Sequence, residues 1–425
     1  MEPSPATRVS CCIAGCGPAG AVLGLLLARS GVDVLVLEKH ADFLRDFRGD
    51  TLHPSTLHLF DELGLADQLL RVPHQQAQVL GVTTDFGEFT LADFGRLPGR
   101  YRFLAFMPQW DFLDFVVGQA RQLPPFELRM EAKAVEVLEE AGRVTGVVYR
   151  DRDGAVHQVR ARLTVAADGR DSALRRAAAL PRTEFGVPID VFWFRLPRRP
   201  TDPQSFGRLA AGHLLVLIDR GVYWQIAYLI PKAAADELHR AGLGRLRASV
   251  AELVPFLEDR VGELRSWEDV RTLRVQMDRL RRWFRPGLLC IGDAAHAMSP
   301  IGGVGINLAV HDAVAAANLL VRPLRDGTLS TRHLARVQLR RLPPTVVVQW
   351  VQRTIQDRFL SPLLAGRVPA KGPLVLRVLR RYPVLQGVPA FVVGIGVLPE
   401  HVRTPAAASA PAAGPAAPAG SPDRR

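Results

Sequence analysis

The sequence predicts an α/β fold in which a Rossmann-like nucleotide-binding domain carries an inserted, β-sheet-rich second domain. Three observations predict it. An apolar run, a glycine-rich turn and a second apolar run open the chain as a βαβ unit over residues 9–37. Strand-rich segments fill the middle of the chain. Parallel-sheet character returns only at residues 287–291, so the nucleotide-binding sheet is expected to combine segments that are distant in sequence.

The turn at residues 15–20 has the spacing of a dinucleotide-binding fingerprint. Gly15 permits a tight turn, Gly17 lets backbone N–H groups approach a pyrophosphate, and Gly20 lets the next helix pack closely on the strand. That helix, predicted over residues 21–29, directs its partial positive charge at the phosphates. A carboxylate after the second strand can accept hydrogen bonds from ribose hydroxyls. The expected nucleotide contacts are Gly15, Gly17, Pro18, Ala19, Gly20 and Glu38.

The remaining elements are predicted from apolar runs that are bounded by glycine, aspartate and proline. Strands are predicted within residues 79–91, 131–139, 143–150, 155–165, 189–230 and 287–291. Helices are predicted at residues 233–257, 307–320, 374–381 and 391–398. The segment 404–425 is rich in alanine and proline and is predicted to be disordered, because it cannot bury enough apolar surface.

Composition excludes several functional classes. The net charge is +12, but the arginines are scattered, so we expect no nucleic-acid partner; attraction for acidic substrates or anionic membranes stays open. We expect no membrane span and no signal peptide, since the most apolar stretch, residues 11–28, is interrupted by glycines and Pro18. Four cysteines form neither a disulfide framework nor a zinc pattern, which predicts a reducing, cytoplasmic location.

Two further polar segments each follow a predicted strand. The first is Ala166-Ala167-Asp168-Gly169-Arg170-Asp171-Ser172, after the meander of residues 131–165. The second begins with Cys290-Ile291-Gly292-Asp293-Ala294-Ala295-His296. It continues through the glycine-rich loop Pro300-Ile301-Gly302-Gly303-Val304-Gly305 to Asn307 at the start of a long helix.

These three segments, in this order, resemble the FAD-dependent aromatic hydroxylases typified by para-hydroxybenzoate hydroxylase, together with the ubiquinone-biosynthesis hydroxylases (group A flavin monooxygenases). The resemblance covers residues 8–345 and is most specific at residues 292–303. It implies a para-hydroxybenzoate hydroxylase-like fold with FAD as cofactor and NADH or NADPH as a transient reductant. It also implies hydroxylation of an aromatic or enol-like small molecule by molecular oxygen, through a flavin hydroperoxide.

The resemblance also implies roles for individual residues. Asp293 is expected to bind the sugar-alcohol chain of FAD, and Asp168 with Gly169 to hold its pyrophosphate and support NAD(P)H use. Arg48 is expected near the FAD phosphates, and Gln109 at the cofactor from a helix start. The remaining expected contacts are Lys39, Gly292, Pro300, Gly303, Val304, Gly305, Ile306 and Asn307.

The loop at residues 300–305 is where we expect the reaction. Pro300, Gly302 and Gly303 let backbone N–H groups approach the flavin ring, and the following helix favours the negative charge that develops there. His53 could act as a base toward a phenol, or could simply begin the helix at Pro54. His296 is expected to be a structural hydrogen-bonding residue. A roof that excludes water could come from Trp193, Phe194, Tyr223 and Trp224, and further substrate contacts from His213 and Tyr223.

The resemblance divides the chain into four parts. The discontinuous FAD-binding domain comprises residues 1–75, 101–185 and 270–345, and the substrate domain comprises residues 76–100 and 186–269. A C-terminal helical region spans residues 346–403, and the disordered tail spans residues 404–425.

Two alternatives stay open. The first is an FAD-dependent reductase or dehydrogenase of a polyene or prenyl group, because Ile226–Lys232 is loosely similar to a segment of the geranylgeranyl reductases. A halogenase is disfavoured, since the chain has no Trp-x-Trp-x-Ile-Pro segment. The second is a non-catalytic lipid carrier of the same fold, whose apolar, basic C-terminal region could lie on a membrane; peripheral membrane contact is not favoured. No motif specifies an oligomeric state.

Overall fold

The N-terminal segment forms the βαβ unit that the sequence predicts. The computed structural model describes residues 7–44, 51–85, 87–203, 207–210, 212–367 and 374–406. Strand β1 (Thr7–Ala14) leads through the glycine turn into helix α1 (Pro18–Arg29), and strand β2 (Val34–Leu37) then pairs parallel to β1. Pro18 at the first helical position suits this start, because its missing N–H would have no partner there.

An eight-stranded sheet organises the nucleotide-binding domain, in the order β19-β20-β11-β1-β2-β8 with β10 and β9 continuing from β11. Strand β11 (Val156–Ala166) pairs parallel with both β1 and β20 (Leu288–Cys290), although these strands are far apart in sequence. The other strands are β8 (Phe126–Arg129), β9 (Lys133–Glu140), β10 (Arg143–Arg150) and β19 (Phe284–Arg285). The sheet is therefore assembled from distant segments, as the sequence predicts.

Alternate residues of β1 enter two different cores. Cys11 and Ile13 pack with helices α1, α4 (Gln109–Ala120) and α8 (Gly305–Arg325), while Cys12 and Ala14 pack with the meander on the other face. Burial on both faces explains why the second half of the strand, Cys11 to Ala14, is apolar. Burial raises the pKa of Cys12 to about 12, so its thiol stays protonated at neutral pH.

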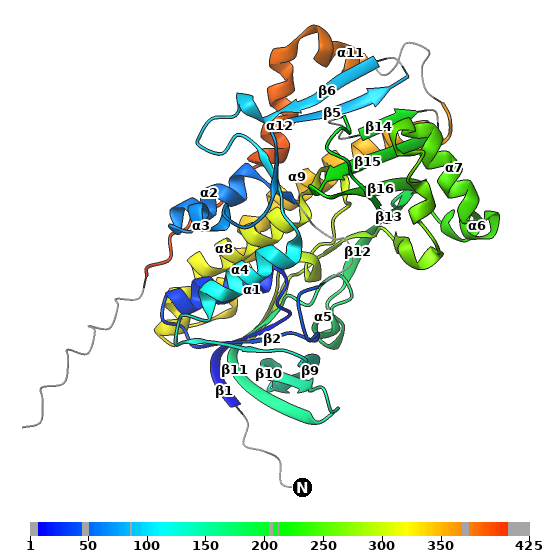
Figure 1. Ribbon diagram of the computed structural model, residues 1–425. Coiled ribbons are helices and arrows are strands. Elements are labelled where there is room, and N and C mark those ends of the chain that lie inside the picture. Colours follow the sequence, from blue (N-terminus) through cyan, green and yellow to red (C-terminus); the bar gives the residue numbers. More distant parts are fainter. Residues whose placement is uncertain are drawn as a thin grey trace, which may run out of the picture.

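A seven-stranded sheet forms the second domain, in the order β17-β13-β16-β15-β14-β5-β6. Figure 1 shows it stacked above the nucleotide-binding domain, with helices α6 (Ala235–Ala241) and α7 (Leu243–Leu253) on its outer side. Its strands are β5 (Val79–Thr84), β6 (Gly87–Asp93), β13 (Ile189–Pro197), β14 (Gly207–Ala210), β15 (His213–Asp219), β16 (Tyr223–Pro231) and β17 (Arg271–Leu273).

Short elements connect the two domains. A three-stranded sheet joins β3 (Thr51–Leu52), β7 (Leu104–Phe106) and β4 (Gln75–Ala77), and β12 (Arg182–Phe185) pairs with β18 (Met277–Leu280). Helices α2 (Pro54–Glu62) and α3 (Ala66–Leu69) follow β3, and α5 (Ala173–Ala177) follows β11. The C-terminal helices are α9 (Thr331–Ile355), α10 (Ser361–Leu364), α11 (Leu374–Arg381) and α12 (Gly387–Gly394).

Two predicted helices are wrong in their bounds. The helix expected over residues 233–257 is split at Gly242, whose φ of +89° cannot continue a helix. The helix expected over residues 391–398 instead runs from Gly387 to Gly394, and Gly396, at φ +80°, lies in the extended segment beyond it.

One described helix, Ile301–Arg325, is long and apolar enough in composition to cross a membrane, but 78% of its apolar window is buried inside the protein. It is the central helix of the domain core.

Candidate active site

Four sequence segments meet at one edge of the large sheet. Strands β1, β2, β11 and β20 run parallel, so their carboxyl ends lie together. The N–H of Ala167 donates to the carbonyl of Ala14 at 2.8 Å, and the N–H of Ile291 donates to the carbonyl of Ala166 at 3.0 Å. The glycine turn, Glu38, Asp168 and Gly292 are thereby neighbours, at the edge where ligands bind in open α/β sheets.

The glycines of the turn serve two different purposes. A Cβ at Gly15 would lie 2.4 Å from the carbonyl oxygen of Ala167, and one at Gly20 would lie 1.9 Å from that of Gly15. Those two positions need glycine for internal packing. A Cβ at Gly17, by contrast, would meet no described atom within 4 Å. Gly17 therefore faces open space before helix α1, where a ligand can approach the backbone.

Helix α1 suits an anion at this point. It begins without a side-chain cap and has no acidic residue in its first turn. Its first N–H groups and the positive end of its dipole therefore face the space in front of Gly17. Pro18 and Ala19 form the first turn, as the fingerprint predicts.

Glu38 lies beside this turn, where a ribose is expected. Its carboxylate accepts hydrogen bonds from the backbone N–H groups of Cys16 at 2.9 Å and His40 at 3.1 Å. A carboxylate can accept further bonds, so ribose hydroxyls are still compatible with these contacts. Lys39, the next residue, is exposed.

Asp168 lies directly behind Gly15. One of its oxygens, Oδ2, accepts from the N–H groups of Ala173 and Leu174 and so caps helix α5. The other, Oδ1, is buried and has no partner among the described residues. Burial raises the pKa of Asp168, although hydrogen bonds from Ser172 and from the backbone oppose this. Gly169 follows Asp168 in the left-handed region at φ +84°.

Gly292 and Asp293 lie beside the first turn of α1. A Cβ at Gly292 would lie 3.1 Å from the Cβ of Ala19 and 3.4 Å from that of Ala309 on α8. The position is therefore restricted to glycine by packing. The Asp293 carboxylate is partly exposed and lies 3.3 Å from the Arg170 guanidinium, so it can reach a cofactor at this edge.

The turn at residues 300–305 has the backbone that the sequence predicts. Gly302 and Gly303 have φ values of +78° and +61°, which favour glycine strongly. Helix α8 then starts at Gly305 with no side-chain cap and no acid in its first turn. Pro300 precedes the turn, and Ile306 packs in the core of the nucleotide-binding domain. The positive end of α8 is directed toward the turn.

Asn307 ties this turn to the start of α2. Its Oδ1 accepts from the N–H of His53 at 2.9 Å and the hydroxyl of Thr56 at 2.6 Å, and its Nδ2 donates to the carbonyls of Thr51 and Gly303. The side-chain amide is fully used by the protein. Its structural role is therefore to hold the turn, and any cofactor contact would come from its backbone.

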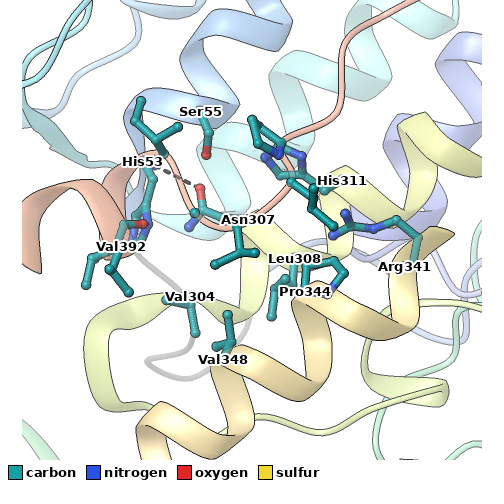
Figure 2. A pocket seen from close by; sticks show the side chains of 16 residues that line it. His53, Ser55, Val304, Asn307, Leu308, His311, Arg341, Pro344, Val348 and Val392 are labelled. Carbon is teal, nitrogen blue, oxygen red and sulfur yellow. Dashed lines mark hydrogen bonds between the residues drawn. The ribbon is translucent and has the colours of Figure 1, made fainter. Parts of the chain in front are cut away.

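His53 is fully buried and lies against the same turn (Figure 2). Its Nδ1–H donates to the carbonyl of Val393 at 2.7 Å, which leaves Nε2 as the unprotonated atom. Nε2 has no hydrogen-bond partner within the described part of the chain and would lie 3.8 Å from a Cβ at Gly303. His53 precedes Pro54 at the start of α2, but its ring makes no capping bond.

We expect His53 to stay neutral throughout the physiological pH range. Burial lowers its pKa from 6.5 to about 4, against the opposing effect of the Val393 carbonyl. Because the folded pKa lies below the unfolded one, the associated stability is complete above pH 6.5 and is lost as the pH falls toward 4. An NMR titration should give a midpoint near 4 for the His53 ring. The melting temperature of His53→Gln should therefore fall less than that of the parent protein over this interval. A midpoint near 6.5 would restore His53 as a neutral-pH base.

The structure also contains a buried ionic network behind Gly292, which the sequence did not predict. The Asp312 carboxylate accepts from the N–H of Gly292 at 3.0 Å, from His296 Nε2 at 2.6 Å and from Arg341 Nε at 2.9 Å. Arg341 also lies 3.4 Å from Glu400 in the C-terminal segment. Burial alone would raise the pKa of Asp312, but His296 and Arg341 hold it below its ordinary value. His296 is thus structural, as predicted.

The predicted aromatic roof is only partly right. Trp193 lies on the inner face of the seven-stranded sheet, in the apolar cluster that includes Ile301. Phe194 and Trp224 lie on the outer face and pack with α7, because neighbouring residues of a strand point to opposite faces. Tyr223 lies at the end of its strand beneath Arg195. His213 is also not placed for substrate, since its Nδ1 pairs with the Tyr228 hydroxyl at 2.6 Å beneath α7.

Two remaining predictions concern Gln109 and Arg48. Gln109 is the first residue of α4 and is partly exposed, as a helix-start contact requires. Arg48 lies outside the described residues.

The residues present fit an FAD molecule. The open space before Gly17 and the uncapped start of α1 suit a pyrophosphate. Glu38 and Asp293 supply acceptors for the sugar hydroxyls on either side.

Comparisons with known proteins agree with an FAD site at this edge of the sheet. A family model described as FAD binding domain matches residues 8–351. The 6-methylpretetramide 4-monooxygenase of Streptomyces rimosus is 35% identical over 371 residues, covering 87% of this chain and 88% of that protein. A digeranylgeranylglycerophospholipid reductase of Methanopyrus kandleri is 25% identical over 344 residues, covering 77% and 84%.

The solved structure of PqsL, a probable FAD-dependent monooxygenase from Pseudomonas aeruginosa, has the same fold. Its TM-score is 0.70 at 23% identity, and the match covers 85% of this chain and 98% of that one. The family match extends over most of the chain and agrees with the geometry of the sheet edge. The chain therefore belongs to the FAD-binding-domain family and is an FAD-dependent monooxygenase of the aromatic-hydroxylase type, with a para-hydroxybenzoate hydroxylase-like fold.

Proposed function

We propose that the protein hydroxylates an electron-rich ring of a flat, polycyclic phenol or enol, with NADH or NADPH as reductant. In the balanced reaction, a ring C–H, dioxygen, NAD(P)H and one proton give a ring C–OH, water and NAD(P)⁺. The class of substrate is supported by the relative in Streptomyces rimosus, whose name gives 6-methylpretetramide as its substrate.

The observation that carries this proposal is the position of the turn at residues 300–305. The turn lies between the uncapped start of α8 and the inner face of the seven-stranded sheet, to which Ile301 contributes an apolar side chain. FAD, held by the start of α1 beside Gly17 and by Glu38 and Asp293, would supply the redox chemistry of hydride acceptance and oxygen-atom transfer when bound. The protein's part is to favour negative charge beside the turn, through the α8 dipole and the N–H groups of the turn.

The inner face of the sheet supplies a dry, apolar wall. Val191, Ala227 and Leu229 are buried there, and Leu360 and Leu363 close the cluster from the C-terminal region. Such a wall excludes water and prefers a flat apolar substrate over a charged one.

Trp193 gives this wall one polar atom. Its indole Nε1 is buried and has no hydrogen-bond partner in the described part of the chain. A buried donor without a partner costs about 1–3 kcal/mol, so a ligand that satisfies it gains affinity. We therefore assign Trp193 to a carbonyl or phenol oxygen of the substrate.

A screen for compounds that accelerate flavin reduction tests this proposal. The purified, FAD-loaded protein is mixed with NADH or NADPH under anaerobic conditions, with and without polycyclic phenols. We expect faster loss of flavin absorbance with the true substrate, and a smaller acceleration in Trp193→Phe, which keeps the ring but loses the donor. If polyenes or prenyl compounds are reduced while phenols have no effect, the protein is a reductase, as its archaeal relative is named. If the protein binds no FAD, the lipid-carrier alternative gains support.

We also propose a cytoplasmic location. It is supported by the four cysteines, all of which are buried and free.

A further inference from the structure

Helices α11 and α12 carry an exposed apolar surface at one end of the molecule, beside β5 and β6 (Figure 1). The exposed fraction is 67% for Leu374, 75% for Val384 and 59% for Val388, values that are high for aliphatic side chains. Several large apolar side chains exposed on two adjoining helices are typical of an interaction site. The C-terminal apolar surface, as we name it, consists of Leu374, Val375, Tyr382, Val384, Leu385, Val388 and Phe391.

Both helices are fixed to the protein by their opposite faces. Leu376 of α11 is buried against Val82 and Phe89 of β5 and β6. In α12, Ala390 is fully buried, and a Cβ at Gly394 would lie 2.9 Å from Leu97. The outward-facing side chains are therefore held in place and are exposed by the fold itself.

The composition of α12 makes its exposure unusual. Its sequence, GVPAFVVG, contains no polar side chain. A helix that is apolar all round is normally buried on every side, either in a core or in a membrane. In α12 one side is buried by the protein, and the side that carries Val388 and Phe391 is left open.

The C-terminal segment is cationic and carries no acid of its own, while the neighbouring β6 contributes Glu88 and Asp93. The sequence from residue 358 to residue 399 has no aspartate or glutamate. Arg377, Arg380 and Arg381 of α11 are exposed, and none of them forms an ion pair with a described residue. The Arg380 and Arg381 guanidinium groups lie over the rings of Phe89 and Tyr382, at 5.2 and 5.3 Å from their centroids. The positive charges are thus held next to the apolar side chains.

We infer that the C-terminal apolar surface docks on an anionic lipid bilayer. Exposed apolar side chains beside unpaired arginines match an interfacial membrane-binding helix, whose apolar residues enter the acyl boundary while the cations meet lipid phosphates. A second copy fits less well, because a two-fold contact would bring the three unpaired arginines of each α11 into one interface. This inference is independent of the reaction proposed above.

A vesicle-binding measurement tests the inference. The full-length, FAD-loaded protein is sedimented with phosphatidylcholine vesicles, with and without phosphatidylglycerol. We expect binding only when phosphatidylglycerol is present, and weaker binding at high salt. The triple variant Arg377→Glu, Arg380→Glu and Arg381→Glu should bind at least about a hundredfold more weakly, since each of the three arginines contributes about fivefold near an anionic surface. The pair Val388→Asp and Phe391→Asp should lose binding as well.

The matched control is the pair Leu339→Asp and Trp350→Asp on α9, which are 74% and 65% exposed and lie outside the C-terminal apolar surface. It should bind vesicles as the parent protein does, and all variants should keep their flavin content and melting temperature. Equal binding to neutral and anionic vesicles, or none to either, would overturn the inference. So would self-association that the Val388→Asp and Phe391→Asp pair abolishes in the absence of lipid, because the surface would then pair two copies.

Discussion

Gly17→Val is expected to abolish FAD binding while leaving the apo-protein folded. A side chain at Gly17 meets no protein atom within 4 Å, and its φ of −73° suits any residue. It would instead occupy the space in front of α1, where the pyrophosphate must approach the backbone N–H groups. Loss of two charge-assisted hydrogen bonds costs about 3 kcal/mol, so the FAD dissociation constant should rise at least about a hundredfold. Titration of the apo-protein with FAD, followed by flavin fluorescence, measures this.

Two comparisons sharpen that result. Gly118→Ala, at an exposed position of α4 that also has no neighbour within 4 Å, should leave FAD binding unchanged and raise the melting temperature slightly, because alanine favours a helix interior more than glycine does. Gly20→Val should fail to fold, because its Cβ would lie 1.9 Å from a backbone oxygen. Normal FAD affinity in Gly17→Val would place the pyrophosphate elsewhere.

Arg341→Met is expected to destabilise the protein more than any single surface substitution. Arg341 is 1% exposed and lies between Asp312 and Glu400, which are themselves buried. Removing the Arg341 guanidinium leaves the buried carboxylates of Asp312 and Glu400 without this cation. Breaking a buried ion pair in this way lowers the free energy of unfolding by about 3–5 kcal/mol. The melting temperature should fall by roughly 3–6 °C. Flavin content should fall as well, because Asp312 also holds the N–H of Gly292 beside the cofactor.

The matched control is Arg322→Met, on the surface of α8 with a side chain that is 91% exposed and paired only with Asp326. Its melting temperature should change by about 1 °C or less. Equal effects of the two substitutions would show that the network at Arg341 contributes no more than an ordinary surface pair. Acid should have the same effect as the mutation. Since the pKa of Asp312 is below its ordinary value when folded, its stabilisation is complete above about pH 4 and is lost as the pH falls further.

The cofactor edge of the sheet could be predicted from the sequence because each of its parts is local. The turn after β1 needs Gly15 for its positive φ and Gly20 for close packing. Both glycines lie within one short stretch of sequence, so the motif can be recognised locally. Asp168 and Gly292 each follow a strand directly. Parallel pairing then brings the strand ends together, so recognising the strands was sufficient.

Side-chain orientation and long-range pairing could not be predicted in the same way. Trp193 and Phe194 are neighbours, and only the pairing of β13 in the folded sheet decides which one lies on the inner face. The Asp312 network joins residues from three distant segments. Besides His296, its signal in the sequence is the pair His311-Asp312 in the buried part of a helix, because a charge there must find buried partners. The partners themselves, Arg341 and Glu400, carry no pattern.

Monooxygenase activity is tested most directly by the origin of the oxygen in the product. The FAD-loaded protein is incubated with NAD(P)H, dioxygen labelled with oxygen-18, and the best substrate from the flavin-reduction screen, and the product is analysed by mass spectrometry. We expect one labelled oxygen atom per product molecule and one dioxygen consumed per NAD(P)H oxidised. A product that contains no labelled oxygen, or one formed without dioxygen consumption, would contradict the assignment.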